Sequence, residues 1–174
     1  DLYEKQSNRF ERYIDVFENL KIEHKIYPCY ETKNELNLKR KKLLNMGRPP
    51  IYDRAALKLT NDEHKKYEND GINPHWRFLL DKKKVSWKDI IIGDVTIDLA
   101  SLSDPVFVKE DGQFLYTLAS VCDDIDFNIT HVVRGSDHLT NTATQIQLIR
   151  NLKGDVPVYG HHSLLVDLAG DNLS

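Results

Sequence analysis

An arginine and a glycine stand directly after the short apolar run His131–Val133, in the order Arg134–Gly135–Ser136–Asp137. An arginine can bind a carboxylate through two parallel N–H bonds, and glycine permits a tight turn. Ser136 and Asp137 can cap the free amides of a following helix. In a parallel α/β sheet, such residues lie at the carboxyl edge of a strand, beside a ligand cleft. The segment therefore predicts a site for a small anion beside a nucleotide.

The same arginine has a structural alternative. Asp123 and Asp124 precede it at a spacing that also fits an ion pair with Arg134, and spacing alone does not choose between the two roles. Consecutive acids at a helix end are more typical of caps or ion-pair partners than of a magnesium site. Tyr116, at the start of the preceding predicted helix, adds a hydroxyl that can donate to a bound carboxylate.

Other common catalytic and metal-binding patterns are absent from the sequence. It contains no GxSxG elbow, Walker loop or GxGxxG, and neither Cys29 nor Cys122 belongs to a CxxC. Cys122 stands among apolar residues, which is typical of a core cysteine. His161 and His162 are neighbours, and neighbours on a strand point to opposite faces. We therefore expect no bound metal and no acyl-enzyme chemistry.

The composition indicates a globular protein. Of 174 residues, 40% are hydrophobic and 29% are charged, and the net charge is only −3. Contact with nucleic acid would therefore need a local patch, such as the basic run Leu38–Lys42, which in isolation reads more simply as a solvated helix face. No apolar run has membrane-spanning length, the opening residues are too polar for a signal peptide, and the cysteines fit a reducing compartment. We expect a cytoplasmic protein, and a start without methionine suggests a fragment.

Hydrophobic periodicity predicts the elements that position these residues. Helices are expected over Gln6–Leu20, with Ser7 as a cap, and from Thr32 to Met46–Gly47, with Glu35 completing a capping box. Residues 51–97 look like a small α+β insertion with extended runs at Ala56–Leu59, Trp76–Leu80 and Val95–Ile97, and a further extended segment is expected at Ile26–Tyr30.

After Ser103, strands and helices alternate with short links. Strands are predicted at Pro105–Lys109, His131–Val133 and Val156–Gly160, with helices opening at Tyr116 and spanning Asp137–Leu152. Such alternation indicates a parallel α/β sheet. Two or three strands are too few for a complete doubly wound sheet, so we expect the remaining strands to lie outside this chain.

Several segments together resemble the bacterial-type glutamyl-tRNA synthetases, which are class I enzymes with a Rossmann catalytic domain. The resemblance is carried by YPCYET, GRPPIYDRAALKL and DPVFVKEDGQFLYTLASVCDDIDFNITHVVRGSDHLTNTATQIQL, with QSNRFERY similar to the QSERF segment of the family. It covers almost the entire chain. The family's HIGH motif lies upstream of QSERF and does not occur here. The KMSKS-type loop would begin at Asn172, Leu173 and Ser174, with Asn172 in place of its first lysine.

The resemblance implies roles for individual residues in ligand binding. Tyr116, Ser120 and Arg134 match positions that hold the substrate glutamate, with the arginine facing its side-chain carboxylate. Ser120 departs from the asparagine of several relatives. The positions that match ATP-binding residues are Asp137, His138, Leu164 and Leu165, with the leucines bracketing adenine and His138 replacing a tryptophan of some members.

The resemblance also bears on the insertion. Many relatives bind zinc there through a CxC and a later cysteine, but Cys29 is followed by Tyr30–Glu31, and Tyr52–Arg54 lacks the later cysteine. The expectation of no zinc therefore stands. Because the family places this insertion against the tRNA acceptor arm, Lys39, Arg40 and Lys42 become candidate contacts for tRNA phosphates.

The implied organisation has three parts. Residues 1–27 form a helix and link of the Rossmann catalytic domain, and residues 28–103 form an inserted α+β subdomain that binds the tRNA acceptor end. Residues 104–174 form the second half of the Rossmann domain and end inside the KMSKS-type loop. The expected fold class is thus α/β, with a partial Rossmann-type parallel sheet and an inserted acceptor-binding subdomain.

The implied function is that of a glutamate–tRNA ligase, which activates L-glutamate with ATP and Mg²⁺ and transfers it to the 3′ end of tRNA(Glu). Whether tRNA(Gln) is also charged stays open, and the expected protein is a monomer. The fragment alone is expected to be inactive, since the groups that stabilise the pentavalent phosphate are missing or cut. Two alternatives stay open: a glutamyl-queuosine tRNA(Asp) synthetase-like enzyme, and a stand-alone RNA-binding module.

Overall fold

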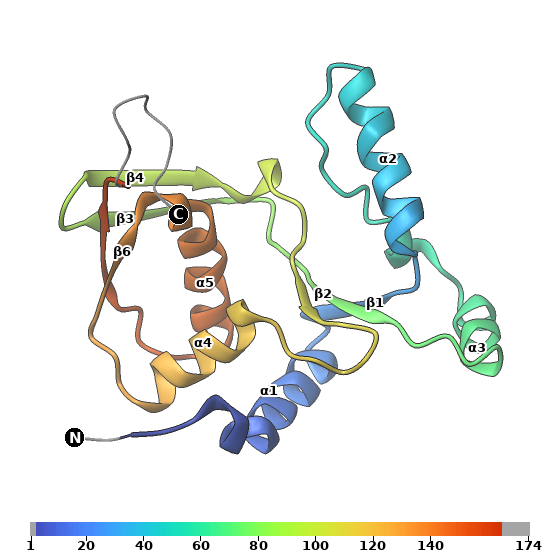
Figure 1. Cartoon of the computed structure of the whole chain (residues 1–174), viewed down its shortest axis with the longest axis horizontal. Helices are drawn as coiled ribbons and strands as arrows, with labels where there is room; N and C mark the ends of the chain where they lie inside the picture. The colour runs from blue at the N-terminus through green and yellow to red at the C-terminus, as the bar shows by residue number, and fades with distance from the viewer. Residues whose placement is uncertain (1–2, 165–174) are drawn as a thin grey trace. The chain divides into compact units, whose positions relative to one another are not determined.

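The computed structural model describes residues 3–164, which fall into two compact units. The first unit comprises the described residues up to Leu80 together with Ser101–Cys122, and the second comprises Asp81–Ala100 and the described residues from Asp123 onward. Each unit is thus built from two separate stretches of chain, which can be followed by colour in Figure 1. The helix α4 (Tyr116–Asp126) crosses the division between them.

The first unit is built on an antiparallel sheet with the strand order β1-β2-β5, formed by Ile26–Cys29, His75–Phe78 and Val106–Val108. Helix α1 (Phe10–Ile22), preceded by a 3-10 turn at Gln6–Arg9, packs on it. The ring of Phe17 meets the ring of Trp76 edge to face, with centroids 5.2 Å apart. The expected helix is confirmed, but its N-terminus has no side-chain cap.

Asp104 is the polar centre of the first unit. Its carboxylate is almost fully buried and accepts hydrogen bonds from the Tyr27 hydroxyl (2.7 Å), the Arg54 Nη2 (2.8 Å) and the Leu80 N–H (3.0 Å). Arg54 Nε lies 2.8 Å from the other carboxylate oxygen, so the ion pair is bidentate. A buried charge with this many partners holds three distant segments together.

Helices α2 (Lys33–Asn45) and α3 (Asn61–Asn69) also belong to the first unit. Both begin with a complete capping box, Thr32 with Glu35 and Thr60 with Glu63. The predicted second helix and its cap are therefore confirmed. Tyr67 is the only apolar residue of α3, so this helix lacks the apolar stripe by which a helix is recognised in a sequence.

One expected extended run in the first unit is wrong. Ala56–Leu59 lies mostly in a 3-10 helix, Ala55–Lys58, rather than in a strand. The turn follows Arg54, whose φ of 57° is left-handed, and a backbone that turns in this way cannot continue as a strand. The run Trp76–Leu80 does lie largely in a strand, β2.

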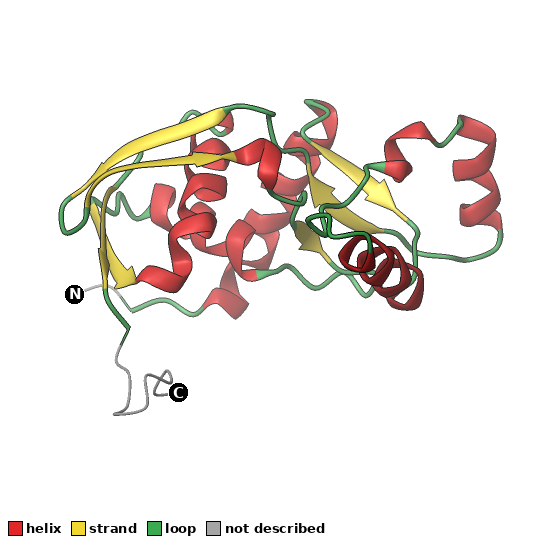
Figure 2. Cartoon of the chain, turned by 90° about the horizontal axis from the view of Figure 1, so that it is seen from above, coloured by secondary structure: helices red, strands yellow, loops and turns green. Residues whose placement is uncertain are grey.

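The second unit contains an antiparallel hairpin and a parallel strand pair. The hairpin strands β3 (Lys84–Asp89) and β4 (Gly93–Asp98) are the two long strands of Figure 2. The parallel pair is β6 (His131–Gly135) with β7 (Val158–His162), in a register that places Arg134 beside His161. Helix α5 (Leu139–Asn151) connects them after the 3-10 turn Ser136–His138.

The parallel pair confirms part of the predicted sheet. The strand expected at Pro105–Lys109 also forms, as β5, but it pairs antiparallel with β2 in the first unit. The parallel sheet therefore has two strands among residues 3–164. Within the same residues, we find no helix whose length and apolar character would let it cross a membrane.

Candidate active site

Arg134 lies near the carboxyl end of β6, as predicted, and neutral side chains of α5 hold it. Its Nη2 donates to the Thr142 hydroxyl oxygen at 2.7 Å and to the Gln145 amide oxygen. Its guanidinium carbon lies 5.6 Å from the ring centroid of Tyr159 on β7. These contacts orient the guanidinium. The arrangement is suited to binding a carboxylate through paired N–H donors.

Asp124 bears on the alternative role of Arg134, which is an ion pair with one of the preceding acids. The pKa of this carboxyl is raised above its usual value, mainly because the group is buried, and the neighbouring Asp123 raises it further. Arg134 acts against both effects and lowers that pKa. Arg134 thus interacts electrostatically with Asp124, while its hydrogen bonds to Thr142 and Gln145 set the orientation of the guanidinium.

Tyr116 and Ser120 lie on α4, in the part of the helix that belongs to the first unit. They stand four residues apart, so they share one face of the helix. The Tyr116 side chain is exposed, and the Ser120 hydroxyl donates to the Thr117 carbonyl oxygen at 3.4 Å. Arg134 belongs to the second unit. The structure thus gathers two of the three predicted glutamate-binding residues on a single helix face.

The predicted nucleotide residues Asp137 and Leu164 gather around Gly135. A Cβ atom on Gly135 would lie 2.6 Å from the Asp137 Oδ1 and 2.8 Å from the Leu164 Cδ2. Only glycine permits this approach without displacing a neighbour. His138 adjoins them, with its Nε2 3.8 Å from the Asp137 Oδ2. Leu165, Asn172, Leu173 and Ser174 lie outside the described residues.

The helix cap expected at Ser136–Asp137 is not formed. Both residues belong to the 3-10 turn, and neither that turn nor α5 begins with a side-chain cap. The Asp137 carboxylate lies next to Gly135 instead, on the side where Leu164 approaches.

Sequence reasoning missed the residues that hold Arg134. Thr142 and Gln145 are polar, yet they are fully or almost fully buried among the apolar residues of α5. The available signal was their spacing: they stand three residues apart on the face that also carries Ile146 and Ile149. Buried polar side chains on an apolar helix face require hydrogen-bond partners, and Arg134 is that partner.

The adjacent histidines point to opposite faces, as expected. His161 is fully buried, and His162 is exposed. Cys122 is also buried and is one of the core residues on α4. Residues 3–164 contain no group of three histidine, cysteine or acidic side chains arranged to hold a metal ion.

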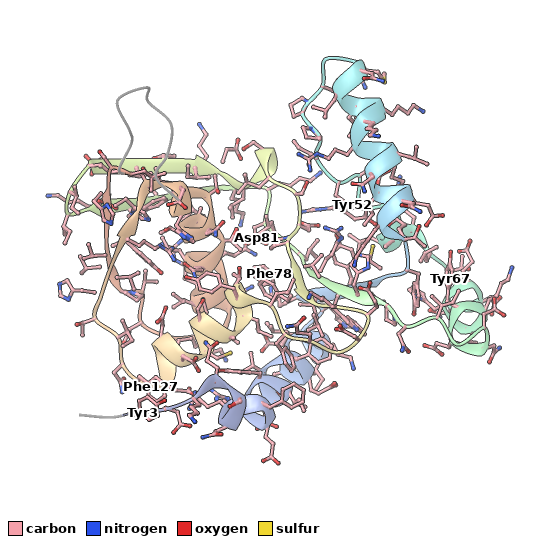
Figure 3. The ribbon with its side chains drawn as sticks, in the orientation of Figure 1. Tyr3, Tyr52, Tyr67, Phe78, Asp81 and Phe127 are labelled. Carbon is pink, nitrogen blue, oxygen red and sulfur yellow. The ribbon has the colours of Figure 1, made fainter. Side chains whose placement is uncertain are left out.

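The basic face of α2 borders a groove of roughly 790 Å³, with Tyr52 at the N-terminal end of the helix (Figure 3). Arg40 and Lys42 are exposed and line this groove, as does Arg48. Lys39 is engaged otherwise, because its ammonium group pairs with Glu31 and lies 3.3 Å from Asp53. Burial would lower the pKa of Lys39, but these two carboxylates raise it above its usual value.

Comparison with known proteins places this geometry in a family. The family model described as "tRNA synthetases class I (E and Q), catalytic domain" matches residues 1–174. Glutamate–tRNA ligase 1 of Paracoccus denitrificans is 51% identical over 174 residues, which are the whole of this chain and 40% of the relative. Glutamate–tRNA ligase 1 of Parvibaculum lavamentivorans is 53% identical, with the chain covering 39% of it. The chain thus spans about two fifths of these relatives.

Solved structures agree with the sequence relatives. A glutamate tRNA ligase from Elizabethkingia meningosepticum, in complex with its amino acid, is 27% identical and superposes with a TM-score of 0.85, covering 95% of this chain and 35% of that one. The glutamate–tRNA synthetase of Elizabethkingia anophelis is 28% identical with a TM-score of 0.86, covering 97% and 36%. The α/β fold expected from the sequence is that of these enzymes. The chain belongs to the class I tRNA synthetases of the glutamate and glutamine group, within their catalytic domain.

Proposed function

We propose that the protein containing this chain is a glutamate–tRNA ligase, which activates L-glutamate with ATP and transfers it to the 3′ end of tRNA(Glu). The carrying observation is Arg134, a guanidinium held at the carboxyl end of β6 by the neutral acceptors Thr142 and Gln145. The similarity to named glutamate–tRNA ligases over the whole chain supports this assignment.

In this proposal Arg134 binds the side-chain carboxylate of glutamate. A bidentate, charge-assisted pair discriminates against glutamine, since the glutamine amide would turn N–H donors toward the N–H donors of the guanidinium. Tyr116 and Ser120 supply hydroxyl groups to the same substrate from their shared face of α4. The catalytic contribution of these residues is to bind and orient glutamate for attack on ATP.

The nucleotide is proposed to bind beside Gly135. Asp137 and His138 contact ATP from the 3-10 turn, and Leu164, with Leu165 next to it, packs against the adenine. ATP brings Mg²⁺ as its counter-ion, which neutralises phosphate charge. Asn172, Leu173 and Ser174 are proposed to open the KMSKS-type loop. Because the chain spans only about two fifths of the named relatives, the isolated chain is expected to be inactive.

Residues 28–103 are proposed to be the inserted subdomain that receives the tRNA acceptor end, between Rossmann segments 1–27 and 104–174. Arg40 and Lys42 are the better candidates for phosphate contacts, because they are exposed along the groove. The support for Lys39 is weaker, because two carboxylates already bind its ammonium group.

We propose that the insertion binds no zinc. Between Glu31 and Asp53, the position of a cation is filled by the Lys39 ammonium group. The Cys29 sulfur lies 3.1 Å from the Glu31 carboxylate and 3.4 Å from the Tyr52 hydroxyl. Burial raises the pKa of the Cys29 thiol, which disfavours the thiolate that zinc requires.

The protein is further proposed to act in the cytoplasm as a monomer. Whether it charges tRNA(Gln) besides tRNA(Glu) stays open, and the named relatives support neither the queuosine-type enzyme nor the RNA-binding module.

The test uses the longest open reading frame that contains this chain. Charging of tRNA(Glu) with radiolabelled glutamate is measured in the presence of ATP and Mg²⁺, with glutamine and aspartate as competing substrates. We expect glutamate-dependent charging and a loss of roughly 100-fold in kcat/KM for Arg134→Ala, because two charge-assisted hydrogen bonds to the substrate disappear.

Arg150→Ala is the matched control, since Arg150 is an exposed arginine near the end of α5, the helix that carries Thr142 and Gln145. Absence of charging with any tRNA fraction would refute the proposed reaction. Charging with an unchanged kcat/KM in Arg134→Ala would refute the role of this arginine.

A further inference from the structure

A buried chain of hydrogen bonds runs behind Arg134. The Asp89 Oδ2 lies 2.6 Å from the His161 Nδ1, and the His161 Nε2 lies 2.9 Å from the Thr142 hydroxyl oxygen. The same hydroxyl oxygen accepts the Nη2 of Arg134 at 2.7 Å. Four side chains therefore form one continuous sequence of contacts that ends at the guanidinium.

This chain is closed to solvent except at its arginine end. His161 and Thr142 have no exposed surface, and Asp89 is 2% exposed. The three come from different elements of the second unit: Asp89 ends β3, His161 lies on β7, and Thr142 lies in the first turn of α5. Because buried polar groups are costly unless paired, each member holds its neighbour in a defined position.

Asp89 fixes the far end of the chain. Its Oδ1 accepts the backbone N–H groups of Ile91 (3.0 Å), Ile92 (3.2 Å) and His161 (3.0 Å). Burial alone would raise the pKa of Asp89, but the hydrogen bonds from His161 and these amides hold it well below its usual range. Asp89 is therefore a carboxylate, and the His161 Nδ1 carries the hydrogen that faces it.

The role of Thr142 does not depend on the charge of His161. With a neutral imidazole, the Thr142 hydroxyl donates to the His161 Nε2. With a charged imidazole, Nε2 donates to the hydroxyl oxygen, and the hydroxyl donates to the His138 carbonyl, 3.1 Å away. In both arrangements the hydroxyl oxygen keeps a lone pair for Arg134. The second acceptor, Gln145, contacts the same guanidinium nitrogen, and together the two fix the plane of the group.

We propose that Asp89, His161 and Thr142 are positioning residues that hold the Arg134 guanidinium in the plane required for paired hydrogen bonds to the substrate carboxylate. The inference rests on the proposed function, in which Arg134 binds glutamate. A bidentate pair needs two donors in one plane, so a guanidinium free to rotate loses affinity for the carboxylate and loses selectivity over the amide of glutamine. The three residues act through Arg134 and do not touch the substrate.

The central experiment compares Thr142→Val with Thr142→Ser in the full reading frame. Valine keeps the shape of the side chain and removes the hydroxyl, whereas serine keeps the hydroxyl and removes a methyl group. We expect Thr142→Val to raise the KM for glutamate by on the order of tenfold, with the KM for ATP unchanged, and to narrow the preference for glutamate over glutamine. Thr142→Ser recovers most of the affinity for glutamate.

Thr144→Val is the matched control. Thr144 is also buried on α5, and its hydroxyl donates to the Thr140 carbonyl of the same helix at 3.5 Å, away from Arg134. A purely structural role for Thr142 predicts that both valine variants lower the melting temperature and leave the ratio of the two KM values unchanged. That result would overturn the proposal.

Substitutions of His161 give an independent test if Thr142→Val does not fold. The asparagine amide can occupy the place of Nδ1, whereas the glutamine amide can reach the place of Nε2. We therefore expect His161→Gln, which keeps the contact with Thr142, to retain more affinity for glutamate than His161→Asn. The reverse order, or equal affinity, would contradict the proposal.

The Arg134→Ala variant separates failure of this inference from failure of the proposed function. If Arg134→Ala leaves the KM for glutamate unchanged, the proposed function of Arg134 is wrong and the inference fails with it. If Arg134→Ala weakens glutamate binding but Thr142→Val behaves like Thr144→Val, only the positioning role is wrong.

Discussion

Replacing Asp104 by alanine should open the first unit while leaving the second largely unaffected. The carboxylate is 2% exposed and accepts hydrogen bonds from Tyr27, Arg54 and Leu80. Its removal leaves a guanidinium, a hydroxyl and an amide without their acceptor. Breaking a buried ion pair by removing one partner costs about 3 to 5 kcal/mol. Because the Arg54 side chain is 23% exposed and can regain some hydration, we expect the lower end, about 3 kcal/mol.

Hydrogen exchange followed by mass spectrometry measures this cost locally. A loss of about 3 kcal/mol speeds exchange roughly 150-fold, since 1.4 kcal/mol corresponds to a factor of ten. The amides of Phe78 and Leu79 report on it, because they donate to the backbone oxygens of Pro105 and Lys25 at 2.9 and 2.8 Å. Asp53→Ala is the control at an exposed ion pair, where the loss should stay below about 1 kcal/mol. Equal acceleration in both variants would refute the reasoning.

Three further substitutions test other parts of the structure. His75→Gln should flatten the pH dependence of stability below about pH 6.5. Burial and the Arg77 charge lower the pKa of His75, so the folded state resists protonation and stability falls as pH drops through the pKa of the unfolded state. Urea midpoints at pH 5.5 and 7.5 measure this, and an equal change of the midpoint with pH in the wild type and the variant would contradict it. Arg40→Ala should raise the KM for tRNA and reduce its salt dependence by about one phosphate contact, whereas Lys41→Ala, which lies on the same helix outside the groove lining, should change neither. Gly135→Ala should raise the KM for ATP because the new Cβ displaces Asp137, whereas Gly154→Ala, which meets a comparably close neighbour, should lower stability without that change.

The elements that the sequence predicted well are those with local signals. Helix α2 carries a capping box and ends before a glycine, and the β6-α5-β7 segment alternates apolar runs with a helical period. Helix α3 also carries a capping box, but it was missed because Tyr67 is its only apolar residue, so its sequence shows no apolar period. The extended run expected at Ala56–Leu59 was wrong because a short apolar stretch is compatible with several backbone conformations. Its 3-10 turn depends on the left-handed conformation of Arg54.

Some residues of the candidate site could likewise be predicted from local sequence, and others could not. Arg134 and Gly135 could be predicted, because an arginine and a glycine at a strand end are visible in a few consecutive residues. Asp89 could not, since it meets His161 across 72 positions of sequence, and nothing local marks that contact. The cap expected at Ser136 does not form, although its local signal is present in the sequence. Instead, the turn brings Asp137 next to Gly135, where Leu164 from a later part of the chain also approaches.

The contacts of Asp104 also constrain the order of events during synthesis. Its carboxylate joins Tyr27, Arg54 and Leu80, which precede it by 77, 50 and 24 positions. Strand β5, which completes the sheet, follows shortly after, so a ribosome must release more than a hundred residues before the first unit can close. The β3–β4 hairpin, which belongs to the second unit, leaves the ribosome during this interval. Until β5 emerges, the nascent chain exposes one edge of β2, which can pair with other unpaired strands.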